Sequence, residues 1–304
     1  MANIYNLENC PIFKLDNPSK WTIQGTSKAG ERTGFLVHPL KIVLDGGVVT
    51  DIKPIAVFNT HSHCDHTLAL PTIFGPRLIK IKGQEHLIGR PLYLPSMAEK
   101  PIEKLMEAAI LLSDNDPTYD TNVDYSIKEN IWKRQGYQPM VVKPNDKFLV
   151  PGLKNIQVEV LKAYHNTETL GYGFSTFRKK LKKEYSNKTP QQLIQLKKDK
   201  IEITEIINCF EFVFFCDSTI ENLTKHDEWK HYPVIICECT GFPEMKKIDK
   251  NCPHTYLDDL EIIIKENREK QWILIHSARS ITAEILMNHQ NRLSSDGLNV
   301  LFIN

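Results

Sequence analysis

The chain has 304 residues, of which 41% are hydrophobic and 25% charged, and its formal net charge is +1. This length suffices for one large α/β domain with a sizeable core, and we expect a single domain over residues 1–304. The near-zero net charge excludes attraction of nucleic acid by a global field, so any basic surface has to be local. No window approaches the roughly 18 apolar residues of a membrane span, and we expect no signal peptide and no membrane partner.

The first half of the chain predicts mainly short apolar strands bounded by Gly, Pro or Asn. They are expected at Phe35–Leu44 with an interruption at Pro39, at Ile55–Phe58 and at Leu78–Ile81. A helix is expected at Met97–Leu112, because apolar residues recur there at helical spacing after Pro101. Residues 114–139 are polar and turn-rich, and we expect them to leave the core as a short excursion.

The second half mixes strands with helices. Strands are expected at Phe148–Val150, Ile156–Ala163, Tyr172–Phe177, Phe210–Phe215, Val234–Cys237, Trp272–Ile275 and Val300–Ile303. Helices are expected at Tyr256–Glu269 and Ile281–Leu293, and the strongly basic residues 178–200 are expected to form a loop. This order predicts an α/β fold in which two mixed sheets are sandwiched between helices.

The seven cysteines are odd in number and show no paired spacing. Reduced thiols are therefore expected, in the cytoplasm or another reducing intracellular compartment. Cys237 and Cys239 could form a soft-metal site, but a buried pair of small apolar side chains is the expected role.

Three histidines and one aspartate lie within six residues, directly after the apolar run that ends at Phe58. They are His61, His63, Asp65 and His66. Imidazole and carboxylate groups are ligands of zinc and similar divalent metals. A turn at the end of a buried strand lets His61 and His63 point together while Asp65 and His66 face a neighbouring point. The run therefore predicts ligands for two metals, whereas a solvated polar loop is a poor explanation for all four residues.

Further ligands are expected at other strand ends, where loops gather and sites form. His165, Asp217 and His276 each follow an apolar, strand-like run. Each alone has an ordinary explanation, namely a surface-loop histidine, a helix N-cap and a half-buried histidine. The same placement three times, beside a complete first motif, favours a joint metal site.

In this order the residues resemble the metallo-β-lactamase superfamily. The resemblance implies an αββα sandwich with two zinc ions per chain. By its pattern one zinc is held by His61, His63 and His165, the other by Asp65, His66 and His276, and Asp217 bridges them.

Further features resemble ribonuclease Z, the endonuclease that trims tRNA 3′ ends, especially its short plant-type form. The similar segments are Gly25 to Gly47, Tyr172 to Lys197, Phe215–Thr219, Ile236–Thr240, and His254 with Leu274–Arg279. The resemblance implies cleavage of pre-tRNA 3′ trailers or related RNA by a homodimer. Two departures stand out. Ser277 follows His276 directly, without the family's intervening aromatic residue. The long arm that grips the tRNA elbow is not evident, because 114–139 is too short for it.

Phosphodiester hydrolysis needs a nucleophile, charge neutralisation and a proton for the leaving group. Two metals roughly 3.5–4 Å apart supply the first two, since zinc lowers the pKa of a bound water to around 7. Asp65 is expected to orient the resulting hydroxide and to act as the base. His254, held by Glu238, is expected to protonate the leaving 3′-side oxygen, a pairing taken from the resemblance. From spacing alone, purely structural roles for Glu238 and His254 are equally good.

RNA contacts are expected from the basic run after Phe177 and from one residue near the metals. The candidates are Lys179, Lys180, Lys182, Lys183 and Arg279. Clustered cations suit phosphate contacts, and an aromatic neighbour such as Tyr185 suits stacking on an unpaired base. The alternatives are a solvated basic loop and a salt bridge from Arg279 to a ligand carboxylate.

Two other functions stay open. One is a broad-specificity hydrolase of the same fold that opens β-lactams or thioesters, with or without ribonuclease activity. The other is a non-catalytic RNA-binding subunit, which the complete set of seven ligands argues against. Zinc is the expected metal, although manganese or iron also occupy nitrogen and oxygen sites.

Overall fold

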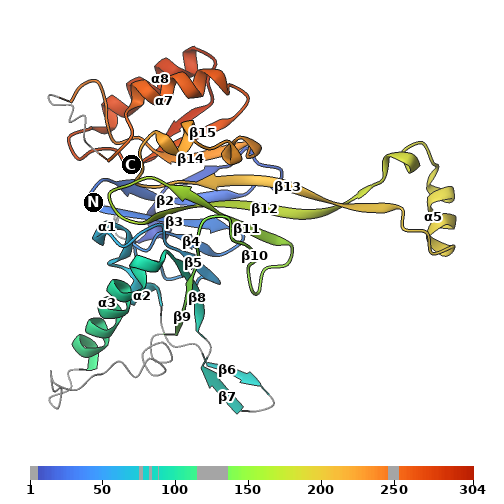
Figure 1. Ribbon diagram of the computed structural model, residues 1–304, viewed down its shortest axis with the longest axis horizontal. Helices are drawn as coiled ribbons and strands as arrows, with labels where there is room; N and C mark the ends of the chain where they lie inside the picture. Colours follow the sequence, from blue (N-terminus) through green and yellow to red (C-terminus); the bar gives the residue numbers. More distant parts are fainter. Residues whose placement is uncertain (1–5, 75–77, 82–83, 88, 115–135, 246–252) are drawn as a thin grey trace.

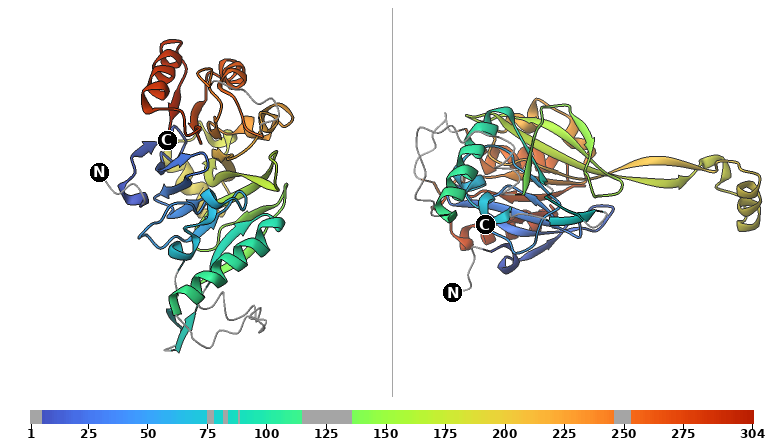
Figure 2. Two further views of the ribbon diagram at one scale, coloured as in Figure 1. Left: turned by 90° about the vertical axis from the view of Figure 1, so that its left-hand side faces the viewer. Right: turned by 90° about the horizontal axis from the view of Figure 1, so that it is seen from below.

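The computed structural model describes residues 6–74, 78–81, 84–87, 89–114, 136–245 and 253–304. Within these residues, two seven-stranded sheets lie face to face and helices cover their outer sides (Figures 1 and 2). Most of the excursion expected at 114–139 falls outside the described residues. No helix in the described ranges is long and apolar enough to cross a membrane.

The first sheet comes from the N-terminal part of the chain. Its strands, in spatial order, are β1 (Ile12–Lys14), β2 (Thr22–Lys28), β3 (Arg32–His38), β4 (Ile42–Leu44), β5 (Ala56–Phe58), β8 (Arg90–Leu94) and β9 (Tyr137–Val141). The pairs from β1 to β4 are antiparallel and those from β4 to β9 are parallel. The strand expected at Phe35–Leu44 is two strands, because Pro39 cannot donate to the ladder and Lys41 turns the chain with a φ of 55°.

The second sheet follows in chain order. Its strands are β10 (Lys147–Leu149), β11 (Ile156–Ala163), β12 (Thr169–Leu181), β13 (Thr204–Phe214), β14 (Val234–Glu238), β15 (Gln271–Ile275) and β16 (Val300–Phe302). The pairs from β10 to β13 are antiparallel and those from β13 to β16 are parallel. Both sheets are therefore mixed, as predicted.

Alternating side chains of the strands build three apolar layers. In β15, Ile273 and Ile275 belong to the layer between the sheets, while Trp272 and Leu274 belong to the layer under the helices. That outer layer is closed by α7 (Leu257–Glu266) and α8 (Ala283–Ser295). A third layer lies between the first sheet and α2 (Leu70–Ile73) with α3 (Ser96–Asp114). The predicted αββα sandwich is confirmed, and the helix expected at Met97–Leu112 is α3.

The aromatic centre of the sandwich supports the strand that leads to the histidine motif. Phe58 ends β5 and is fully buried, with its ring 4.7 Å from Tyr93 and 5.1 Å from Phe174. Replacing such a side chain by alanine costs about 3–5 kcal/mol of stability. The histidine motif thus starts at His61, three residues beyond a densely packed point.

The remaining elements are short. They are η1 (Leu7–Asn9), α1 (Cys64–Thr67), the hairpin of β6 (Leu78–Ile81) and β7 (Gln84–Leu87), α6 (Glu221–Thr224) and η3 (Glu228–His231). Cys237 and Cys239 are free thiols within the layer under α7 and α8, as predicted.

β12 and β13 continue beyond the body of the protein as a two-stranded arm (Figure 1). Their pairing runs out to Leu181 and Thr204, and the end carries η2 (Lys183–Tyr185) and α5 (Pro190–Lys198). A capping box formed by Thr189 and Gln192 starts α5. The prediction of a loop at 178–200 is therefore wrong. An extended arm does exist, and it leaves the fold at 178–204.

The arm escaped prediction because its strands have no apolar face to reveal them. From Arg178 to Lys180 the side chains of β12 are exposed, and the outer part of β13 is exposed or half-buried. Each strand is held by backbone hydrogen bonds to a partner more than 20 residues away in the sequence. Such pairing leaves no local hydrophobic period.

Candidate metal centre

Four strand ends bring the metal-competent side chains to one edge of the sandwich. The loop after β5 carries His61 and His63 and leads into α1 with Asp65 and His66. The other three follow the C-terminal ends of β11, β13 and β15, and they are His165, Asp217 and His276. All seven residues proposed as ligands therefore meet at one point of the fold.

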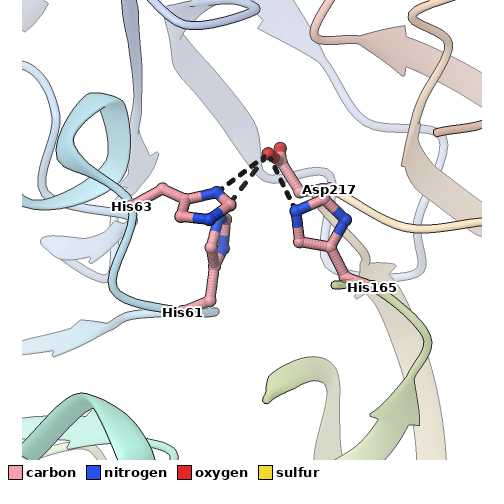
Figure 3. Close-up of side chains that lie close together, drawn as sticks. All are labelled: His61, His63, His165 and Asp217. Carbon is pink, nitrogen blue, oxygen red and sulfur yellow. Dashed lines mark ion pairs between the residues drawn. The ribbon is translucent and has the colours of Figure 1, made fainter. Parts of the chain in front are cut away.

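Three imidazoles face one oxygen of Asp217 (Figure 3). The distances to Oδ2 of Asp217 are 3.5 Å from Nε2 of His61, 3.9 Å from Nδ1 of His63 and 3.8 Å from Nε2 of His165. The four ligand atoms of this group lie within 4.8 Å of one another. One cation of ordinary size can therefore be reached by all four.

A second group lies on the other oxygen of Asp217. Nε2 of His66 and Nε2 of His276 are 3.2 and 3.0 Å from Oδ1 of Asp217. The same two nitrogens are each 3.4 Å from Oδ2 of Asp65. Since Asp217 presents one oxygen to each group, its carboxylate has the geometry of a bridge between two adjacent cation sites.

The donor atoms fit a pair of metal ions. Nε2 of His61, of His66 and of His165 is buried without a hydrogen-bond partner, although buried polar atoms are nearly always satisfied. Burial lowers the pKa of His61 to about 4, so this imidazole is neutral and in its metal-binding form near pH 7. Cations between these nitrogens and the carboxylates would satisfy every one of these atoms.

The far side of each buried imidazole is fixed by a hydrogen-bonding partner. Nδ1 of His66 lies 2.9 Å from Oδ2 of Asp45, and Nδ1 of His165 lies 3.0 Å from the carbonyl oxygen of Pro253. Such contacts fix the tautomer and aim Nε2 at the centre. Burial alone would lower the pKa of His66, but the carboxylates of Asp217 and Asp45 raise it well above its ordinary value.

Glu238 and His254 form a carboxylate–imidazole pair beside this centre. Glu238 ends β14 and is buried, and its Oε2 lies 2.7 Å from Nδ1 of His254. Its Oε1 accepts hydrogen bonds from the backbone N–H groups of Ser218 and Thr255 at 2.7 and 3.0 Å. Burial would lower the pKa of His254, but Glu238 raises it above its ordinary value. The ring of His254 lies 5.5 Å from that of His276.

No family model matches the chain. Among solved structures, the metallo-β-lactamase fold protein YhfI from Bacillus subtilis is similar, with a TM-score of 0.53 at 13% identity over 93% of this chain and 96% of that one. The chain has the metallo-β-lactamase fold.

The sequence is similar to plant tRNase Z proteins. The chloroplastic tRNase Z TRZ2 of Arabidopsis thaliana is 27% identical over 273 residues, covering 87% of this chain and 70% of the relative. The tRNase Z TRZ1 of Arabidopsis thaliana is 25% identical over 274 residues, covering 87% of this chain and 88% of the relative. The resemblance stated from local motifs therefore holds along most of the chain.

Three residues of this candidate site have strained backbones. Asp45, Asp217 and His276 have φ values of 56°, 33° and 62°, in the left-handed region that non-glycine residues rarely adopt. Such conformations persist where the surrounding structure holds them, and they cluster at functional sites. Here they turn the side chains of Asp217 and His276 toward the centre and that of Asp45 toward His66.

The lysines proposed for RNA contacts lie far from this centre in the fold. Lys179 and Lys180 are exposed on the arm part of β12, and Lys182 and Lys183 follow it. β12 starts at Thr169, beside the centre, and runs away from it (Figure 1). These lysines can therefore contact only a distant part of a long substrate.

Arg279 holds a turn rather than a ligand carboxylate. Its guanidinium donates to the carbonyl oxygens of Ala29 and Gly30 in the turn between β2 and β3. In the same turn, the backbone N–H of Gly30 donates to Oδ2 of Asp65 at 2.8 Å. Arg279 therefore positions the backbone group that orients Asp65.

Sequence reasoning missed several polar partners of the candidate ligands. Asp45 accepts from the backbone N–H of Thr60 at 2.7 Å, and the hydroxyl of Thr60 lies 3.0 Å from Nδ1 of His61. Oγ1 of Thr240 lies 3.1 Å from Nδ1 of His276. Asp45, directly after the apolar end of β4, carries the same signal as the ligands that were found. Thr60 and Thr240 carry no distinguishing signal.

Proposed function

We propose that the protein is a ribonuclease Z-type endoribonuclease that cuts pre-tRNA 3′ trailers or related RNA with two zinc ions. One observation carries the proposal. Asp217 joins two groups of metal-competent side chains, and the Glu238–His254 pair lies at their border. The similarity to plant tRNase Z proteins supports the choice of RNA as substrate.

Zinc is the proposed metal because imidazole nitrogen and carboxylate oxygen are its usual ligands. His61, His63 and His165 would hold one ion, Asp65, His66 and His276 the other, and Asp217 both. When bound, a pair of such ions activates water and neutralises charge on a phosphodiester. Burial would raise the pKa of Asp65, but hydrogen bonds with His276 and His66 lower it, so this carboxylate is ionised. Asp65 can therefore accept a hydrogen bond from the attacking water.

His254 is the proposed proton donor for the leaving oxygen. Its Nδ1 is committed to Glu238, so Nε2 is the atom that can reach substrate. The raised pKa keeps the imidazole protonated to higher pH than usual. As the leaving oxygen gains negative charge, Nε2–H of His254 would donate its proton, and Glu238 would stabilise the imidazolium until then.

The arm is the proposed second contact with RNA. Residues 178–203 contain nine Lys and Arg against three Asp and Glu, while the whole chain has a net charge of only +1. The positive charge is therefore concentrated on the arm, which suits binding to phosphates. Because the arm leaves the edge opposite to the centre, RNA bound at the centre of one copy could at the same time be held by the arm of a second copy. This supports the proposed homodimer, which light scattering of the purified protein would test.

The deciding experiment incubates the zinc-loaded protein with a 3′-extended pre-tRNA and maps any cut to the nucleotide, with the β-lactam nitrocefin in parallel. A single cut after the discriminator base is expected. Scattered RNA cuts together with nitrocefin turnover would instead indicate a broad-specificity metallo-hydrolase, the second candidate function. Absence of hydrolysis with both substrates, in protein that holds two metals, would contradict the proposal.

The free thiols of the described cysteines support a reducing intracellular compartment as the location of the protein.

A further inference from the structure

A cavity of about 530 Å³ opens directly beside the candidate metal centre. Sites of this size take small molecules or parts of larger ones. Its wall includes Tyr164, His165, Thr219, His254, Tyr256 and Asp259. Since His165 also lies 3.8 Å from Asp217, the cavity starts at the metal cluster itself. It extends on the side of His254.

Tyr256 forms a fixed aromatic part of this wall. It is the N-cap residue of α7, and its ring lies against Gly241, where a Cβ atom would come within 2.0 Å of the ring. Glycine at position 241 therefore lets the ring rest on backbone atoms. Aromatic rings held in this way stack on unpaired bases with little loss of side-chain entropy.

Acidic groups make the same wall unsuitable for phosphate. Asp259 lies three residues after Tyr256 and hence on the same face of α7. Its carboxylate is exposed, and no hydrogen bond or ion pair holds it among the residues that the structure describes. Glu221 also lines the cavity, paired with Lys225 at 2.7 Å. Carboxylates repel phosphate but accept hydrogen bonds from the amino groups of bases.

We propose that this cavity binds the base of the nucleotide that carries the leaving oxygen. Tyr256 stacks on that base, and Asp259 accepts a hydrogen bond from its exocyclic amino group. Bases with an amino group are therefore preferred over uracil. The inference rests on the proposed function, in which His254 protonates the leaving oxygen. His254 lies between the candidate metal ligands and the cavity. The nucleoside that carries the leaving oxygen therefore lies at the cavity, while the phosphate that is cleaved from this oxygen lies at the metals.

The test measures kcat and KM for pre-tRNA substrates that differ only at this nucleotide. The nucleotide at this position carries adenine, cytosine, guanine, uracil or no base. End-group analysis of the products identifies which nucleotide kept the leaving oxygen. We expect the abasic substrate to lose about 10- to 100-fold in kcat/KM, the range of one aromatic–base stack. Uracil should fall between the abasic substrate and the amino-bearing bases. The loss should lie mainly in KM, because stacking and the amino contact exist before the bond breaks.

Four variants assign the preference to this wall. Tyr256→Leu should remove most of the difference between the normal and abasic substrates, whereas Tyr256→Phe keeps the ring and should retain it. Asp259→Asn should narrow the difference between cytosine and uracil. Asp258→Asn is the matched control, because it removes the same charge from the same turn of α7 at an exposed position that does not line the cavity.

The outcomes separate this inference from the proposed function. RNA cleavage without any base preference, or with a preference that Tyr256→Leu and Asp259→Asn leave unchanged, would overturn the base site while the ribonuclease stands. If the protein cleaves no RNA, binding decides the matter. Fluorescein-labelled penta-adenylate and penta-uridylate are then titrated against the metal-loaded protein. Tighter binding of penta-adenylate that depends on Tyr256 would support the base site. Equal affinity for the two oligonucleotides would contradict it.

Discussion

Asp217 presents one carboxylate oxygen to each half of the candidate centre. Its Oδ2 faces three histidines and its Oδ1 faces His66 and His276. Asp217 lies three residues after the end of β13, and its backbone adopts a φ of 33° there. The roles of single residues around it lead to two predictions.

His254→Gln should reduce kcat for RNA cleavage by about 10²–10⁴-fold, the usual contribution of a positioned general acid. The pKa of His254 is raised above 6.5, so activity that depends on its proton is present below that pKa and is lost as the pH rises through it. The variant should lack this alkaline decline. The measurement is the pH profile of kcat, and nitrocefin opening should suffer less.

His289→Gln is the control for His254, because His289 on α8 also pairs with a glutamate, Glu244, at 2.8 Å but belongs to neither group of candidate ligands. An equal loss on RNA and nitrocefin in the His254 variant would argue against its role as leaving-group acid.

Asp45→Asn should weaken metal binding, because Asp45 fixes the ring of His66 at 2.9 Å. Loss of such an orienting carboxylate typically costs about 10–100-fold in metal affinity. Competition with a chromophoric chelator measures the affinity, and atomic emission measures the metal content. Asp51→Asn, at an exposed position bonded to Asn6, should change neither. Unchanged affinity in the Asp45 variant would mean that His66 is oriented without it.

At the scale of elements, a hydrogen-bond network around Glu211 fixes the root of the arm. β12 and β13 separate from the body where Glu211, a buried carboxylate, accepts hydrogen bonds from Ser19, Thr176 and Arg178. This network ties the N-terminal segment to the root of the arm. The arm beyond it carries the concentrated positive charge.

Glu211→Ala should lower the free energy of unfolding by about 1–3 kcal/mol, the cost of leaving buried donors without their acceptor. Ser19 loses an acceptor for both its N–H, at 2.9 Å, and its hydroxyl, at 2.5 Å. Urea unfolding monitored by tryptophan fluorescence measures the change. Glu205→Ala, exposed on the same strand, is the control and should stay within about 0.5 kcal/mol. Equal stability of the two variants would show that the network contributes nothing.

Neutralising the four arm lysines should weaken pre-tRNA binding and flatten its dependence on salt. If each lysine contacts one phosphate, the slope of log K against log salt should fall by about 3, from 0.7–0.9 per contact. Fluorescence anisotropy at several salt concentrations measures it. The variants replace Lys179, Lys180, Lys182 and Lys183 by glutamine.

The control set removes the same charge from exposed lysines elsewhere. It replaces Lys14, Lys100, Lys104 and Lys265 by glutamine. If the two sets lower the slope equally, the arm has no special part in binding RNA. Cleavage of a short oligonucleotide, which cannot reach the arm, should be the same in both sets.

For the whole molecule, the candidate centre joins both sheets. The segment after β5 belongs to the first sheet, and those after β11, β13 and β15 belong to the second. Metal bound there would bridge the two halves of the sandwich, and binding to the native state alone would stabilise it.

Removal of metal should therefore lower the midpoint of thermal unfolding. At a free zinc concentration 100 times the dissociation constant, binding contributes about 2.7 kcal/mol. Differential scanning fluorimetry with a chelator, followed by zinc titration, measures the shift. Asp217→Asn should lose most of this shift, because Asp217 faces both groups of candidate ligands. An apo-protein with the same midpoint, and no bound metal after zinc addition, would refute the two-metal proposal.

Many strands and all candidate metal ligands could be predicted from residue types and spacing. The candidate metal motif is local, since four candidate ligands lie within six residues, and the strands that precede the other candidates are apolar runs with clear ends. Ile156–Ala163 was predicted with the bounds that β11 has. β2 was not predicted, because Gln24, Thr26 and Ser27 are polar yet buried, and only pairing with β1 and β3 makes them a strand.

The sequence by itself determined the types of the candidate ligands, their order along the chain and the apolar strands that support them, because these are local properties of side chains. Only the tertiary structure decided how they are used. It set one oxygen of Asp217 toward each group, placed Asp45 behind His66, directed Arg279 to a backbone turn and sent the basic segment outward as an arm. These outcomes depend on contacts between residues far apart in the sequence, and no local pattern records such contacts.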